Sequence, residues 1–258
     1  MFFVTSVLLA LTLPPTIPLW MAGVGVVFAV IFGKMAFGGF ATNIFNPALV
    51  GRCFLYIAFP LAMTAGWVNP KDRGVFPAGL AAWRADAVTS ATPLDTYKAK
   101  EPVDLAASFL GNEPGSLGET SALLIALGGA YLLIRRVASP WIVGGCLAGG
   151  IVSAAILHAV SPAQVGGPLF QLLTGGFLFG AFFMATDPVS AAKTNPGRLL
   201  YGILIGALTV VLRGYSNFSC GFTFAVLLGN MFAPLMDAGV REYQAWRRAA
   251  AAPAGPTG

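Results

Sequence analysis

Charged residues are scarce in this sequence: they make up 10% of its 258 residues, whereas 57% are hydrophobic. A soluble domain carries about 25% charged residues, so this chain lacks the polar surface that would cover it in water. The scarcity excludes an ordinary soluble protein. It predicts an all-α, polytopic integral membrane protein.

Residues that bind metals are also scarce, with three cysteines and one histidine. Cys53, Cys146 and Cys220 lie far apart in or beside apolar runs, so we expect small buried side chains rather than ligands. His158 alone cannot form a metal site. The sequence contains neither a Walker loop nor a dinucleotide fingerprint. The basic residues stand singly between apolar segments, which indicates membrane topology and no nucleic-acid binding.

Long apolar runs are what the sequence does have, and we expect about eight membrane segments. The first is short for a span of about 20 residues and ends at Pro14-Pro15. Asn46-Pro47 predicts a helix start, with Asn as the N-cap and Pro in the first turn. The expected segments are 2–13, 16–32, 46–64, 119–133, 142–160, 170–184, 199–213 and 222–235.

The charge that exists is concentrated in residues 66–118, which must therefore lie outside the hydrocarbon. This insert divides the chain into an N-terminal membrane part (1–65), the insert (66–118), a five-helix membrane part (119–240) and a charged tail (241–258). If successive segments cross the membrane in opposite directions, most other basic residues fall on one side, which the positive-inside rule makes cytoplasmic. Arg213 is an exception. The residues on the basic side are Lys34, Arg52, Arg135, Arg136, Lys193, Arg198, Arg241, Arg247 and Arg248. The insert, with Thr92, is then extracytoplasmic.

Two glycine-loosened breaks echo each other in the two membrane parts. Gly38-Gly39 leads to Asn46-Pro47, and Gly175-Gly176 leads to Asp187-Pro188. Paired broken helices predict an inverted-repeat architecture with a site near the breaks. Asp187, a carboxylate at membrane depth, is a candidate functional residue, an N-cap for a helix begun by Pro188, or both.

Two further polar residues stand out, and the residues alone assign neither of them chemistry. Asp237 ends an apolar run and is better interpreted as a solvated helix end than as a functional carboxylate. Thr92 precedes a proline, which is typical of a turn, and no adjacent base would activate its hydroxyl.

Six stretches, in order and over nearly the whole chain, resemble the family that contains the NqrB subunit of the sodium-translocating NADH:quinone reductase and the RnfD subunit of the related Rnf complex. They are 3–20 (FVTSVLLALTLPPTIPLW), 38–52 (GGFATNIFNPALVGR), 86–94 (DAVTSATPL), 111–121 (GNEPGSLGETS), 180–190 (GAFFMATDPVS) and 227–237 (LLGNMFAPLMD). The resemblance implies a bacterial inner-membrane subunit that works with other subunits of its complex.

The resemblance also implies two flavins. A flavin transferase would attach FMN through a phosphoester to Thr92, the last residue of a motif in which Asp86, Thr89 and Ala91 match and Ser90 replaces the usual glycine. Riboflavin would bind without a covalent bond near the breaks.

The residues that match the family at the riboflavin site are Asn43, Asn46 and Asp187, and amide side chains suit a flavin ring because they donate and accept. Asp237 resembles a family carboxylate linked to sodium uptake. The family's subunits begin before the point that matches Phe3, so the chain looks truncated, and the residues associated with quinone fall in the missing part.

The implied function is electron transfer through FMN and riboflavin toward quinone, coupled to Na⁺ export. Residues 16–20 and 232–235 favour the quinone reductase, whereas residues 91–98 (ATPLDTYK) favour the RnfD subunit of the Rnf complex, which remains the alternative. A second alternative is a transporter or channel without redox chemistry, because broken inverted repeats are also typical of transporters.

Overall fold

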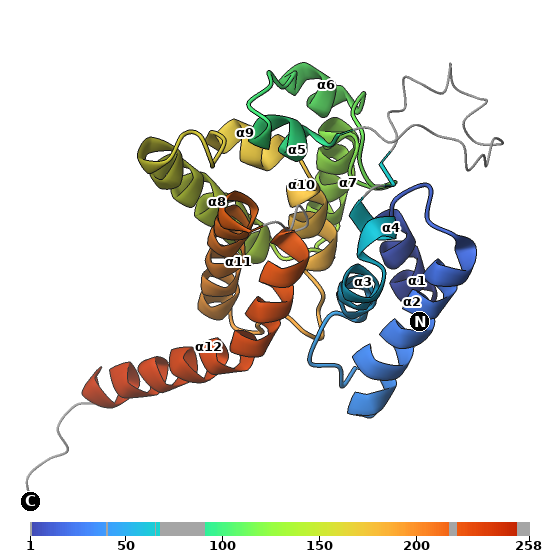
Figure 1. Cartoon of the computed structure of the whole chain (residues 1–258). Helices are drawn as coiled ribbons and strands as arrows, with labels where there is room; N and C mark the ends of the chain where they lie inside the picture. The colour runs from blue at the N-terminus through green and yellow to red at the C-terminus, as the bar shows by residue number, and fades with distance from the viewer. Residues whose placement is uncertain (1, 40, 65, 68–90, 217–220, 252–258) are drawn as a thin grey trace, which may run out of the picture.

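The computed structural model describes residues 2–39, 41–64, 66–67, 91–216 and 221–251, and throughout these residues the regular structure is helical (Figure 1). The N-terminal part contains α1 (Phe2–Leu11), α2 (Leu19–Gly33), η1 (Met35–Phe37), α3 (Pro47–Ala58) and α4 (Pro60–Thr64). The next part contains α5 (Pro93–Lys98), α6 (Leu105–Leu110), α7 (Ala122–Ile134) and α8 (Pro140–Val160). The last part contains α9 (Pro168–Leu173), α10 (Phe177–Phe179), η4 (Gly180–Met184), α11 (Asn195–Tyr215) and α12 (Gly221–Ala251).

Side-chain caps explain where several of these helices begin. Asn46 accepts hydrogen bonds from the backbone N–H groups of Ala48 and Leu49, and Pro47 opens α3, as the sequence predicted. An N-cap of this kind satisfies N–H groups that have no partner inside the helix. The other helices that begin with a bonded N-cap are α5 at Thr92, α6 at Asp104, α7 at Ser121 and α11 at Thr194.

Four helices of the described chain are long and apolar enough to cross a membrane: 19–37, 140–160, 195–215 and 221–250. The expected number of about eight spans is not confirmed, nor is the inverted repeat. The apolar runs break into shorter pieces, since α3 has 12 residues and α7 has 13. A 12-residue helix rises about 18 Å, less than the hydrocarbon thickness of about 30 Å. Residues 170–184, expected as one segment, divide between α9, α10 and η4.

The tightest helix pair, α8 with α11, is built on glycines. Gly145 of α8 packs on Gly202 of α11, Gly206 of α11 packs on Gly150 of α8, and a Cβ on Gly149 would lie 2.3 Å from the carbonyl oxygen of Ile203. Small residues at a four-residue spacing let helix backbones approach this closely in membrane proteins. The glycines therefore form a rigid support for the helices that line the sites below.

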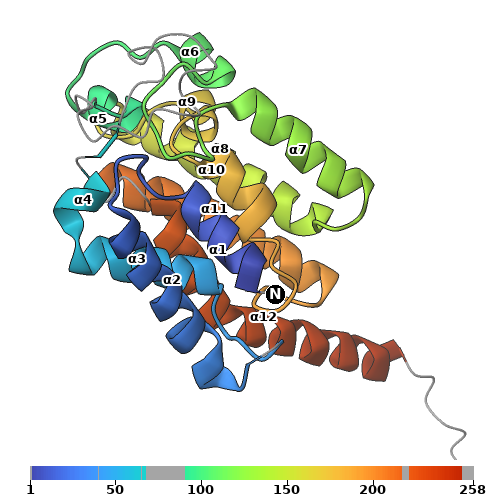
Figure 2. The same ribbon diagram turned by 90° about the vertical axis from the view of Figure 1, so that its right-hand side faces the viewer.

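The two ends of the molecule differ in the elements that they hold. In both views α5, α6 and α9 gather at one end, while the C-terminal half of α12 leaves the body at the other (Figures 1 and 2). Thr92, at the start of α5, is thus far from the basic tail. The compartment that each end faces stays a prediction.

The two breaks are alike at their glycine pairs and differ at the Asn-Pro and Asp-Pro pairs that follow. Gly38, Gly39, Gly175 and Gly176 all have positive φ, between 59° and 101°, which glycine adopts without steric cost. Asn46-Pro47 then begins a helix, but Asp187-Pro188 does not. The Asp187 carboxylate accepts from the Val189 N–H and the Ser190 hydroxyl and closes a turn instead. The expected helix start at Pro188 is therefore wrong, because α11 begins at Asn195 behind the Thr194 cap.

Candidate functional site

Thr92 is an ordered, nearly buried residue whose hydroxyl already has a partner. It is 8% exposed and forms a capping box with Asp95 at the start of α5. The hydroxyl donates to Asp95 Oδ2 at 2.6 Å, and the Asp95 backbone N–H donates back to the Thr92 hydroxyl oxygen at 3.3 Å. The geometry holds the Thr92 Oγ1 atom in one place. Attachment of any group to this oxygen requires the bond to Asp95 to break.

Long-range contacts hold α5 against the membrane helices. The Tyr97 hydroxyl donates to the Pro162 carbonyl oxygen at 2.6 Å, and its ring packs 4.7 Å from that of Phe170. Lys98 Nζ donates to the Ser216 carbonyl oxygen at 2.9 Å. Of the rest of the predicted attachment motif, Ala91 is exposed, while Asp86, Thr89 and Ser90 lie outside the described residues.

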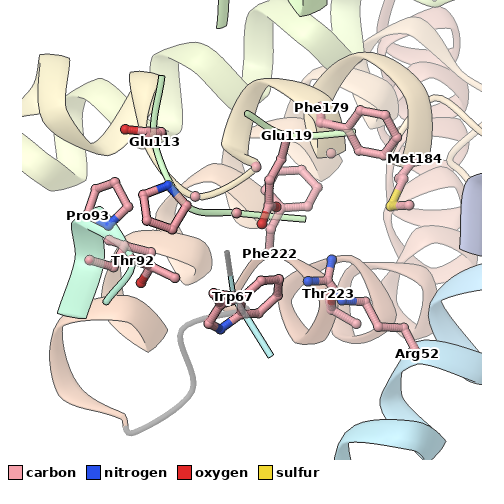
Figure 3. Close-up of a pocket in the computed structure, with 16 residues that line it drawn as sticks. Arg52, Trp67, Thr92, Pro93, Glu113, Glu119, Phe179, Met184, Phe222 and Thr223 are labelled. Carbon is pink, nitrogen blue, oxygen red and sulfur yellow. The ribbon is translucent and has the colours of Figure 1, made fainter. Parts of the chain in front are cut away.

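A small cavity lies beside Thr92, between aromatic and charged side chains (Figure 3). Its lining combines residues that are far apart in the sequence: Arg52, Trp67, Thr92, Glu113, Glu119, Phe179, Met184, Phe222 and Thr223. Aromatic faces and a guanidinium suit a flavin, but the free volume of about 30 Å³ is smaller than its ring system. FMN bound to Thr92 therefore requires this lining to part.

Arg52 is placed differently from the prediction that counted it among the basic residues of the opposite side. It lies in the second turn of α3, is buried, and lines the cavity beside Thr92. The segment count failed here because Arg52 is inside a helix rather than in a loop. A charged side chain buried among membrane helices is expensive and usually functional.

Glu113 is the most perturbed carboxyl of this region. It follows α6, is 5% exposed and accepts a short hydrogen bond from the Ser108 hydroxyl. Burial raises the pKa of Glu113 to about 7; the Ser108 bond opposes the rise, and the neighbouring Glu119 adds to it. Near neutral pH this carboxyl therefore exchanges a proton beside Thr92.

We expect Glu113 to make the folded protein less stable as the pH rises from about 4.5 to about 7. Its pKa is raised in the folded state from an ordinary value of 4.5, so the folded chain binds the proton more tightly and loses that advantage across this window. Glu113→Gln, which stays neutral and can still accept from Ser108, should flatten the slope. Thermal unfolding in detergent at about pH 5 and about pH 8 measures it.

The matched control for this prediction is Glu101→Gln, which removes one exposed carboxylate. It should retain the fall in melting temperature that the parent shows between the two pH values. An unchanged fall in Glu113→Gln would contradict the assignment.

A second cavity, of about 460 Å³, is lined by Asn43, Asn46 and Asp187, the residues that the resemblance assigns to riboflavin. Lys34, Phe182 and Phe183 also line it. Sites for small molecules measure about 300–1,000 Å³ and combine apolar walls with a few polar groups. The volume and the residue types of this cavity therefore fit riboflavin.

The polar side chains of this second cavity are not equally available to a ligand. Asn46 uses Oδ1 as the α3 cap, and its Nδ2 donates to the Met184 carbonyl oxygen at 3.2 Å. Asn43 Nδ2 donates to the Phe45 carbonyl oxygen at 3.0 Å, and Asp187 is half-buried within its own turn. Asn46 is thus chiefly a framework residue. Its bond to Met184 ties the first break to the second.

The segment that receives this bond is a π-helix, η4, with five residues. Single turns of π-helix often occur at functional sites. Met184 lines the Thr92 cavity, whereas Phe182 and Phe183 line the second cavity. Asn46, the N-cap of α3, lines the second cavity, and Arg52 of α3 lines the Thr92 cavity. Six residues of α-helix separate these two residues by about 9 Å. The two cavities therefore flank one contact between α3 and η4.

Asp237 is not a solvated helix end, because it is 5% exposed. Its carboxylate accepts from the backbone N–H groups of Lys193 and Thr194 at 2.7 and 2.9 Å and from the Thr194 hydroxyl at 2.6 Å. Asp237 thereby binds α12 to the N-cap of α11. It also lines a third cavity, of about 290 Å³, together with Asn43 and Asn230.

Comparison with known proteins identifies the family to which this architecture belongs. A model of the NQR2, RnfD, RnfE family matches residues 1–245. The chain belongs to this family. It is 42% identical over 258 aligned residues to the B-type subunit (NqrB) of the Na⁺-translocating NADH-quinone reductase of Pseudomonas aeruginosa, an alignment that covers 96% of the chain and 62% of the relative. The NqrB subunit of Chromohalobacter salexigens is 45% identical over 249 residues, with 92% and 57% covered.

A third relative, the NqrB subunit of Klebsiella pneumoniae, is 41% identical over 255 residues, which cover 92% of the chain and 58% of the relative. The chain thus spans about three fifths of the length of these curated relatives. Apolar helices and membership of the NQR2, RnfD, RnfE family together make it a multi-pass membrane protein.

Arg52 and Glu113 line the Thr92 cavity and Arg213 binds Gly175 of its lining, and none of the three was predicted as a site residue. Arg213, in the last turn of α11, donates to the Gln171 carbonyl oxygen at 2.8 Å and to that of Gly175, and lies 5.7 Å over the Phe177 ring. Arg213 and Arg52 could have been found as charges within apolar runs. Glu113 carried no such signal, because its pattern is that of a turn.

The histidine and cysteines hold no metal site in the part of the chain that is described. His158 Nδ1 lies 2.7 Å from the Val165 carbonyl oxygen, next to the segment that receives the Tyr97 hydroxyl. Cys146 is buried and Cys53 is half-buried, whereas Cys220 lies outside the described residues. His158, Cys53 and Cys146 therefore contribute to packing and local hydrogen bonding.

Proposed function

We propose that this chain is a membrane flavoprotein subunit of a Na⁺-translocating NADH:quinone reductase. It would pass electrons through FMN on Thr92 and through riboflavin in the second cavity toward quinone, coupled to sodium export. The activity would belong to the assembled complex, with NADH oxidised on other subunits. The observation that supports this proposal most is the convergence of Asn43, Asn46 and Asp187 on one cavity whose size suits a flavin.

The chain's own residues would perform distinct tasks in this proposal. Phe182 and Phe183 would cover the faces of the riboflavin ring, and Asn43 with Asp187 would bind its polar edge. Asn46 would hold the cavity open by joining α3 to η4. At the other end, the Thr92 hydroxyl would receive FMN from a flavin transferase. The flavins, when bound, would supply the one- and two-electron redox chemistry that side chains lack.

Asp237 would contribute negative charge to the ion pathway. Its carboxylate lies in the third cavity, which shares Asn43 with the second. Three donors already bind its oxygens. We therefore propose that Asp237 attracts Na⁺ to the cavity through its charge, and that its carboxylate by itself does not replace the water ligands of the ion. The same arrangement could serve a sodium pathway in an Rnf complex.

The RnfD subunit of the Rnf complex is the alternative, which the resemblance of residues 91–98 (ATPLDTYK) favours. The relatives reported above favour the quinone reductase instead. Co-purification distinguishes the two: subunits of an NADH:quinone reductase should accompany the chain, and not those of a ferredoxin-oxidising complex.

The experiment that tests the flavoprotein proposal is co-expression of the full chain with a flavin transferase. After a denaturing gel, the wild-type band should fluoresce as a flavin because a phosphoester survives denaturation. A dark band would refute the covalent FMN on Thr92, and the non-redox transporter would become the better function if riboflavin were also absent from the native protein.

A further inference from the structure

Beyond Asp237 and Arg241, which line the third cavity, the C-terminal half of α12 has no role in the sites described above. α12 runs from Gly221 to Ala251 and contains Pro234, which removes one backbone hydrogen bond and bends a helix. Both views show the later residues leaving the body opposite α5, α6 and α9 and running sideways beyond the other helices (Figures 1 and 2). We call residues 238–251 the tail helix. Every residue from Arg241 to Ala250 is exposed.

The tail helix has one apolar and one basic face. Gly239, Tyr243, Trp246 and Ala250 recur at helical spacing and share a face, while Arg241, Gln244 and Arg248 share the opposite one. Tyr243 and Trp246 are 59% and 66% exposed, and their ring centroids lie 6.2 Å apart. A water-exposed surface of this kind needs a partner that is apolar on one side and polar on the other.

The charge of the tail helix selects that partner. Arg241, Arg247 and Arg248 stand against one acidic residue, Glu242. Tyrosine and tryptophan concentrate at membrane–water boundaries, and arginines bind anionic lipid headgroups. An amphipathic helix with a basic polar face and aromatic residues on the other lies in the plane of the membrane surface. It follows the apolar part of α12, which ends at Met236, so that surface is within its reach.

We propose that the tail helix is a lipid-binding element, which lies along the bilayer surface with Tyr243 and Trp246 among the acyl chains and its arginines on anionic headgroups. It binds phosphatidylglycerol-containing membranes in preference to neutral ones. The spanning helices then meet the bilayer at a defined depth at this end of the protein. This inference does not depend on either flavin.

Spin labels on adjacent positions test the orientation. In the full chain with Cys53→Ser, Cys146→Ala and Cys220→Ser, a nitroxide is placed by Tyr243→Cys or, as the matched control, by Gln244→Cys. The chain is reconstituted in nanodiscs of phosphatidylcholine alone or with added phosphatidylglycerol. With phosphatidylglycerol, the label at position 243 should contact dissolved oxygen and avoid a water-soluble nickel chelate, and the label at 244 should stay accessible to the chelate.

Other patterns of accessibility would overturn the proposal. If both labels meet the chelate in anionic nanodiscs, the tail helix is free in water. If both are protected, or if position 243 becomes protected only when other proteins of the complex are added, a protein covers this face.

The arginines are tested by the triple variant Arg241→Gln, Arg247→Gln and Arg248→Gln. The difference between the two lipid compositions at position 243 should then disappear, and its persistence would overturn the role of charge. Should the cysteine replacements prevent folding, brominated lipids replace the labels. Quenching that is lost on Trp246→Phe supports the same position, whereas equal quenching in parent and variant contradicts it.

Discussion

Replacing Thr92 with alanine should leave the chain without covalent flavin. The threonine oxygen Oγ1 is the atom through which a phosphoester to FMN would form, and alanine has no equivalent. Loss should be complete rather than partial, because alanine offers no oxygen at the position in which the capping box holds Oγ1. In-gel flavin fluorescence and the intact mass of the purified chain measure the result.

Thr92→Ala also removes the N-cap of α5, which costs about 1 kcal/mol, so the control has to separate the cap from the attachment. Thr92→Asn provides this control, because asparagine caps helices well but offers no hydroxyl. It should keep the parent's melting temperature and still lack flavin. Thr96→Ala, which deletes the next hydroxyl on the same helix, should keep the flavin. A Thr92→Ala band that still fluoresces would refute the assignment.

Asn46→Ala should have the second large effect, on both stability and riboflavin content. The variant loses the α3 cap and the hydrogen bond to the Met184 carbonyl oxygen, which then keeps only the Asp187 backbone N–H, at 3.4 Å, as a donor. These losses cost about 1 kcal/mol and about 0.5–1.5 kcal/mol, so the free energy of unfolding should fall by about 2 kcal/mol. The lost bond joins the two breaks beside the second cavity. The fraction of chains that hold non-covalent flavin should therefore fall together with the stability. Unfolding in detergent and chromatography of extracted flavin measure the two effects.

Asn46→Asp isolates the contact between the breaks. Aspartate keeps the acceptor that caps α3 but offers no donor to the Met184 carbonyl oxygen. It should therefore keep the start of α3 and still lose riboflavin. If both variants retain one riboflavin per chain, the flavin does not occupy this cavity, and the proposed function would need another site.

The elements that could be predicted are those with local causes. Asn46-Pro47 predicted the start of α3 because an N-cap and its proline act within one helical turn. Gly175-Gly176 predicted a break because both residues take positive φ. Asp187-Pro188 carries the same local pattern and begins no helix, since its carboxylate closes a turn and Thr194 caps the helix that follows.

The environment of a buried polar group depends on residues that are distant in the sequence, and here local reasoning failed. Asp237 has the pattern of a solvated end, yet three donors from residues 193 and 194 surround it. Arg52 was counted with the loops, although α3 carries it into the cavity of Thr92. Glu113 has the sequence pattern of a turn residue, but in the fold it is buried, accepts from the Ser108 hydroxyl and has a raised pKa.

The amino-acid sequence by itself determined that this is a multi-pass membrane protein, because composition sets which solvent a chain can face. The resemblance of six stretches to a known family also singled out Thr92, Asn43, Asn46 and Asp187, although the residues alone assigned Thr92 no chemistry. Only the tertiary structure decided that three of these residues meet at one cavity while Thr92 lies in another. The physical reason is the Asn46–Met184 hydrogen bond, which joins residues 138 positions apart and which no local pattern specifies.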